Sequence, residues 1–139
     1  HEAARKRMTQ KYRRFYEIYG DPEDRMRKYR EEVKQYVSDN IERVYHKIKN
    51  IIQDLEIKDI PDDILLYNYR VLKKYNFGKD IEDFINKEFA NYLTGSYRFP
   101  SLKLGLTESI INEKIEYYIK KKLLLPLIKK ELRIRGLIY

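Results

Sequence analysis

The chain has 139 residues, of which 42% are hydrophobic and 37% charged, with a formal net charge of +8 and a pI near 9.4. This length suits one domain, and so large a charged fraction disfavours a large buried sheet and favours helices that each bury one apolar stripe. The absence of cysteine excludes disulfide bonds and thiolate metal sites, and no apolar run approaches the roughly 18 residues of a membrane span.

The positive charge is concentrated at the two ends of the sequence. Residues 1–30 hold ten Lys or Arg against five Asp or Glu, and residues 94–139 hold ten against four. The middle, residues 31–93, holds ten against thirteen. This distribution indicates a phosphate-rich polymer or an anionic membrane as partner, in preference to an acidic small molecule.

The N-terminal segment predicts a basic helix over residues 3–19. Its apolar side chains form one narrow seam, and Lys and Arg cover most of the remaining surface. Its only acids are Glu2 and Glu17, so it lacks the spaced Glu–Lys pairs that usually balance such charge within a helix. We therefore expect an outside polyanion or an acidic neighbouring subunit to supply the counter-charge; a solvated face is the alternative.

A turn at Gly20 and a strong start signal at Asp21-Pro22 predict a second helix over residues 23–55. Its apolar residues recur at steps of three and four, and its length of roughly 50 Å is enough to project beyond a small bundle. Basic residues continue through its first turns, so the two helices form a basic helix-turn-helix arm. The residues expected to contact DNA phosphates are Arg5, Lys6, Arg7, Lys11, Arg13, Arg14, Arg25, Arg27, Lys28 and Arg30.

Three further helices are predicted over residues 62–75, 81–93 and 107–135, the last kinked or broken at Pro126. Breakers make residues 94–106 a loop, in which 97–104 is the one candidate for a short β-ribbon. The predicted fold is all-α. The basic helix-turn-helix arm and long helix (residues 1–56) lead into a small bundle of about four helices (residues 57–139), as one structural unit.

The sequence predicts neither an enzyme nor a metal or cofactor site. His46 has only an ordinary helix partner in Glu42, and the acidic pairs at 62–63 and 80–83 fall in first helical turns, where acids favour the helix dipole. There is no glycine-rich phosphate loop and no nucleophile motif.

The C-terminal KKKLLLPLIKKELRIRGLIY places an apolar run between cations. Such a run suits either a membrane surface or a helix end packed on a partner subunit, and the second is the simpler interpretation. The residues expected to contact an envelope or a subunit are Leu123, Leu124, Leu125, Leu127 and Ile128.

The segment RKRMTQKYRRFYEIYGDPEDRMRKYR, followed by a long helix and a compact bundle, resembles the major coat proteins of filamentous archaeal viruses, with the enveloped lipothrixvirus type similar in size and layout. The resemblance spans the chain and rests on organisation, because the family has no short motif. It implies a structural virion protein, assembled in the host cytoplasm, whose arm wraps double-stranded DNA without sequence preference. It also implies a helical filament of paired subunits, identical or paralogous, with the DNA in A-form and a lipid envelope outside the bundle.

Two alternatives stay open. The first is a helical-bundle nucleic-acid-binding domain of a plasmid or viral replication protein, such as a primase accessory domain, which binds short single strands as a monomer. The second is a purely protein-binding bundle, which shows no salt-sensitive DNA binding.

Overall fold

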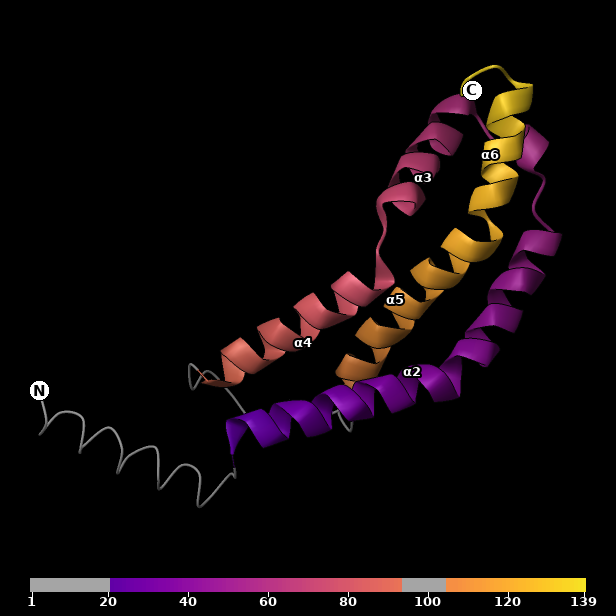
Figure 1. Cartoon of the computed structure of the whole chain (residues 1–139). Coiled ribbons are helices and arrows are strands. Elements are labelled where there is room, and N and C mark those ends of the chain that lie inside the picture. The colour runs from indigo at the N-terminus through magenta and orange to yellow at the C-terminus, as the bar shows by residue number, and fades with distance from the viewer. Residues whose placement is uncertain (1–20, 94–104) are drawn as a thin grey trace, which may run out of the picture.

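The computed structural model describes residues 21–93 and 105–139. Within these ranges the protein is all-α and contains no strand, which confirms the predicted fold class (Figure 1). The predicted helix over 3–19 and the candidate ribbon over 97–104 lie outside the described residues. The elements are α2 (Pro22–Gln53), the 3-10 helix η1 (Ile57–Asp59), α3 (Asp62–Lys74), α4 (Phe77–Leu93), α5 (Gly105–Leu123) and α6 (Leu125–Ile134).

The start of α2 follows the sequence signal closely. The Asp21 carboxylate accepts a hydrogen bond from the backbone N–H of Glu23 at 3.0 Å, and Pro22 occupies the first helical position. The helix then runs for 32 residues, or about 48 Å at 1.5 Å per residue.

The long helix lies along the bundle and bends with it. Its buried residues run from Tyr29 to Ile48, so most of its length packs on other helices, and Figure 1 shows that its two halves are not collinear. The Asn40 side chain donates to the Tyr36 carbonyl at 2.8 Å, a contact that competes with the regular backbone ladder and accompanies helix bending. Only the last turn leaves a large apolar side chain open, at Ile51, which is 56% exposed.

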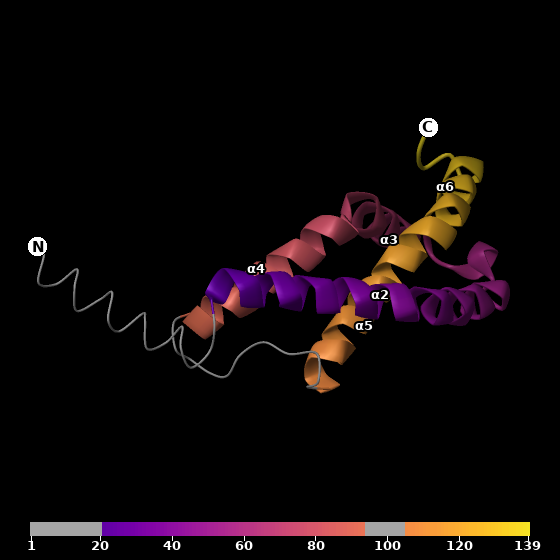
Figure 2. The same cartoon turned by 60° about the horizontal axis from the view of Figure 1, so that its bottom comes forward.

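The larger of two apolar clusters joins α2 to α4 and α5. Figure 2 shows how these three helices are arranged. Burying side chains of this size contributes about 1.5–3 kcal/mol each, which makes this cluster the main support of the bundle. The helix α2 is therefore part of the same core as the bundle helices. The buried members are Tyr29, Val33, Val44, Ile48, Ile81, Ile85, Ile111, Ile115 and Ile119.

The smaller cluster joins α3 to α6. Its buried members are five aliphatic residues, and Ile57 of η1 packs at its edge. Figure 1 shows the two helices side by side at the end of the molecule that holds the C-terminus. The five are Leu65, Leu72, Leu125, Ile128 and Leu132.

Two predicted boundaries differ from the structure. The helix expected from Ile81 begins at Phe77, because the Asn76 side chain caps it by accepting from the Lys79 N–H at 3.1 Å. The predicted C-terminal helix is two helices, and the break falls at Leu124, before Pro126. Proline has no N–H to donate and its ring crowds the preceding turn, but in the first turn of α6 it is tolerated.

The C-terminal end of α6 is closed by a glycine cap. Gly136 has φ of 73°, a left-handed conformation that glycine adopts without strain. Its N–H donates to Arg133 O at 3.0 Å, and the Leu137 N–H donates to Leu132 O at 2.9 Å, so two carbonyls of the last turn are satisfied.

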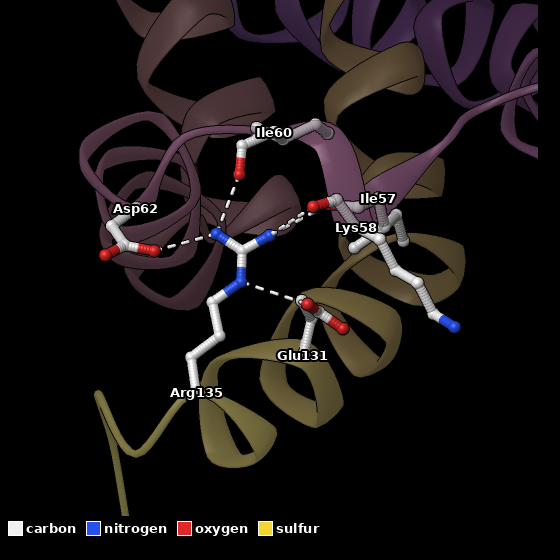
Figure 3. A network of polar contacts seen from close by, with 6 residues as sticks. All are labelled: Ile57, Lys58, Ile60, Asp62, Glu131 and Arg135. Atoms are coloured by element: carbon white, nitrogen blue, oxygen red, sulfur yellow. Dashed lines mark hydrogen bonds and ion pairs between the residues drawn. The ribbon is translucent and has the colours of Figure 1, made fainter.

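Arg135 ties this end of α6 to η1 and the start of α3 (Figure 3). Its Nε donates to Glu131 Oε1 at 2.9 Å, and its Nη1 donates to Asp62 Oδ1 at 2.8 Å and Ile60 O at 2.7 Å. Its Nη2 donates to the carbonyls of Ile57 and Lys58 at 3.2 and 3.1 Å. All five N–H groups of the guanidinium thus have acceptors within the protein. Arg135 therefore has a structural role in holding the C-terminal end of α6.

Candidate nucleic-acid interface

The described structure contains four of the ten residues predicted to bind DNA, all in the first turns of α2. The other six lie outside the described residues. The four within it are Arg25, Arg27, Lys28 and Arg30, and the six outside it are Arg5, Lys6, Arg7, Lys11, Arg13 and Arg14.

Two of the four, Arg27 and Lys28, face solvent. Arg27 Nη2 lies 2.6 Å from Asp24 Oδ1, one turn earlier on the same helix, and its side chain remains 70% exposed. Both residues line a shallow hollow of about 650 Å³ together with Glu31 and Glu32. The surface of α2 therefore mixes both signs of charge, and a phosphate approaching Arg27 or Lys28 has two carboxylates close by.

Arg30 and Arg25 are less accessible. The Arg30 guanidinium faces α4 and binds Glu82 through two hydrogen bonds of 3.0 Å. Arg25 is half-buried. The four predicted residues thus differ in role within the described fold, and the exposed pair is the one directly open to a partner.

A second basic site lies where the two apolar clusters meet, and it was not expected from the sequence. The end of α3, the α3–α4 connection, the start of α4 and the end of α5 surround a hollow of about 700 Å³. We call it the lysine pocket. Its lining residues are Lys73, Lys74, Tyr75, Asn76, Phe77, Gly78, Tyr118, Lys121, Lys122 and Leu125.

Two backbone carbonyls and one aromatic ring hold two lysines of this pocket in place. Lys121 Nζ donates to Tyr75 O at 2.6 Å and to Lys73 O at 3.4 Å. Lys122 Nζ lies 4.6 Å from the centre of the Tyr118 ring, a cation–π distance. None of the four lysines pairs with a carboxylate of the described residues.

The carboxylate next to this pocket is already neutralised. Asp80 Oδ1 lies 2.8 Å from Lys114 Nζ, and Asp80 Oδ2 accepts from the Tyr75 hydroxyl at 2.9 Å. The same hydroxyl lies 3.2 Å from Lys114 O, so its proton is shared between two acceptors. Burial, and then the hydrogen bond to Asp80, raise the pKa of Tyr75 above its usual range, so the hydroxyl stays neutral.

The leucine-rich run lies mostly inside the protein. Leu125 and Ile128 are buried in the smaller cluster, where Leu124 also packs, and Leu123 packs against the larger one. Leu127, 39% exposed, is the member of the run that remains open to a subunit or an envelope.

The described residues contain no group of three or more His, Asp or Glu side chains arranged to hold a metal ion. His46 is exposed, and its Nε2 lies 3.8 Å from Glu42 Oε1, the ordinary helix pair expected from the sequence. That the protein is not an enzyme stays a prediction. Among the helices of the described chain, none is both long and apolar enough to cross a membrane.

Comparisons with protein-family models, with curated proteins and with solved structures give no match to this chain.

Proposed function

We propose that the protein is a structural virion component that binds and wraps double-stranded DNA without sequence preference and assembles with copies of itself, or with a paralogous subunit, into a helical filament. The observation that carries the proposal is the unbalanced charge of the N-terminal segment. Its first nineteen residues hold six Lys or Arg against two Glu, and such an excess favours a polyanion as partner.

The start of α2, which the segment precedes, offers it little net counter-charge, because residues 21–32 hold five Asp or Glu against four Lys or Arg. Asp24 pairs with Arg27, and Glu82 of α4 pairs with Arg30. Glu31 lies 3.7 Å from Lys34. Since these carboxylates already have cationic partners, an outside anion is the better match for the segment, and the regular phosphates of a duplex supply it.

Assembly, the A-form of the DNA, the lipid envelope and the location in a virion follow from the resemblance to filamentous archaeal virus coats. Exposed apolar side chains at Leu127 and Ile51 are compatible with subunit contacts in a filament. Assembly with DNA is the part of this proposal that can be tested directly by imaging.

The test of DNA binding is a salt titration with matched variants. Arg7→Gln/Lys11→Gln/Arg14→Gln removes three charges from one flank of the predicted helix, and Lys49→Gln/Lys87→Gln/Lys130→Gln removes three exposed charges elsewhere. If the segment binds phosphates, the first variant lowers the slope of log K against log[salt] by up to about 2.7, because each neutralised phosphate contributes about 0.9 to that slope. Equal slopes in both variants, or no duplex binding at low salt, would overturn the proposal.

The test of assembly is negative-stain imaging of the protein mixed with long duplexes. Filaments of regular width support the structural role. Binding of short single strands by a monomer, without filaments, would instead favour the replication-protein domain.

A further inference from the structure

We propose that the lysine pocket is a site for closely spaced phosphate groups, carried either by a nucleic-acid strand or by a free polyphosphate. The inference does not depend on the wrapping function proposed above. It rests on four lysine residues that the ends of α3 and α5 bring to the wall of one hollow, with no acid among its lining residues.

The fold itself offers too little negative charge to balance these lysines. Lys73 and Lys74 lie in the last turn of α3, and Lys121 and Lys122 in the last turn of α5, where cations favour the helix dipole. A helix C-terminus is equivalent to only about −0.5 charge, so two of them leave most of four full charges unanswered. The start of α4 at Phe77, which also borders the hollow, adds a positive helix end.

The lysines are placed for a ligand that touches several of them at once. The backbone carbonyls that hold Lys121 fix one ammonium group within the pocket wall. Lys73 Nζ lies 3.3 Å from Tyr69 Oη, and Lys122 rests over Tyr118. Aromatic contacts of this kind orient an ammonium group without neutralising it, so the charge remains available to an anion.

The aromatic residues of the pocket favour phosphate over a stacked base as the bound group. The Phe77 and Tyr118 rings already lie against one another, with centroids 4.7 Å apart, and Lys122 covers Tyr118. The Tyr75 ring packs on Tyr117 with centroids 5.5 Å apart. Because these rings are engaged within the protein, the lysines are the groups that contact the ligand. The hollow, about 700 Å³, has the size of ordinary small-ligand sites.

The test compares two double variants of the full chain that remove equal charge. Lys74→Gln/Lys122→Gln acts on exposed pocket lysines, and Lys87→Gln/Lys130→Gln acts on exposed lysines of α4 and α6 outside the lining. The probe is tripolyphosphate at low salt, measured by isothermal titration calorimetry, with helicity checked by circular dichroism. We expect the pocket variant to weaken binding at least about tenfold and the control variant less than about twofold, because only the first removes two of the four lysine charges that line the hollow.

Parallel titrations with short single-stranded and duplex DNA identify the source of the phosphates. A selective loss of DNA affinity in the pocket variant assigns the site to a strand, and a loss with tripolyphosphate alone assigns it to a free polyphosphate. Absence of tripolyphosphate binding by the wild-type chain, or equal weakening in both variants, would overturn the inference. Either outcome is independent of the N-terminal triple variant, so this site and the proposed wrapping function are tested separately.

Discussion

Arg30 of α2 and Glu82 of α4 are joined by two parallel hydrogen bonds, Nε to Oε1 and Nη2 to Oε2, each 3.0 Å long. The pair lies at the rim of the larger cluster, with the Arg30 side chain 31% and the Glu82 side chain 45% exposed. It places one of the predicted DNA-binding residues in a contact between helices. Its two possible roles, holding α4 and binding phosphate, are separable by experiment.

A double-mutant cycle with Arg30→Gln and Glu82→Gln measures the structural role. Because the pair is partly exposed to water and salt, we expect a coupling of about 0.2–1 kcal/mol in the free energy of unfolding from urea denaturation. Titrations with duplex DNA measure the second role. If Arg30 exchanges Glu82 for a phosphate, Arg30→Gln lowers the slope of log K against log[salt] by about 0.9. Arg43→Gln, which changes an exposed side chain further along α2, serves as the control. An unchanged slope in Arg30→Gln assigns the residue to the fold alone.

Helix α6 gives a contrast between a buried and an exposed leucine. Leu132→Ala removes a fully buried side chain from the smaller cluster and is expected to lower the free energy of unfolding by about 2–5 kcal/mol. Leu127→Ala, at an exposed position of the same helix, is expected to cost less than about 1 kcal/mol in the isolated protein. Urea denaturation followed by circular dichroism measures both. Similar destabilisation in the two variants would contradict the described packing of α6.

Arg135→Lys tests the network that joins α6 to η1 and the start of α3. A lysine ammonium has three donors and no planar fork, so it cannot reach the five acceptors that the guanidinium meets. We expect a clear drop in the midpoint of thermal unfolding. Arg133→Lys, where Nε makes one long contact of 3.3 Å to Tyr139 O, is expected to change it little. Equal midpoints in the two variants would show that the network is dispensable.

Tyr75→Phe probes alkaline stability. The folded-state pKa of the Tyr75 hydroxyl is raised, so above the unfolded value near 10 the unfolded chain loses a proton that the folded chain keeps. The stabilisation from this group is therefore complete below about pH 10 and is lost as the pH rises above it. At neutral pH, Tyr75→Phe is expected to lower the free energy of unfolding by about 0.5–1.5 kcal/mol. Above pH 10, the free energy of unfolding of this variant falls less steeply than that of the wild type. Tyr67→Phe, on a 67% exposed side chain, is the control and follows the wild-type slope.

Local signals in the sequence are sufficient for most of the helices and insufficient for the lysine pocket. Asp21 and Pro22 determine the start of α2 through contacts within two residues. The apolar steps of three and four expected along this helix match the inner face that buries Tyr29, Val33, Val44 and Ile48. The start of α4 predicted at residue 81 is too late, because the Asn76 cap begins the helix at Phe77.

The lysine pocket depends on contacts between distant parts of the chain. Its lysines are two short runs, at 73–74 and 121–122, and each run alone has the appearance of an ordinary basic helix end. Their convergence follows from the packing of α3 on α6 and of α4 on α5, which helical periodicity alone does not determine.

The break at Leu124 joins α5 to α6 so closely that the rotation of one helix relative to the other affects both apolar clusters. Leu123 belongs to the larger cluster and Leu125 to the smaller one, with a single residue between the helices. One residue added within the first turn of α6 would turn Ile128 and Leu132 by about 100° relative to the preceding backbone, away from α3. The joint is therefore intolerant of changes in chain length.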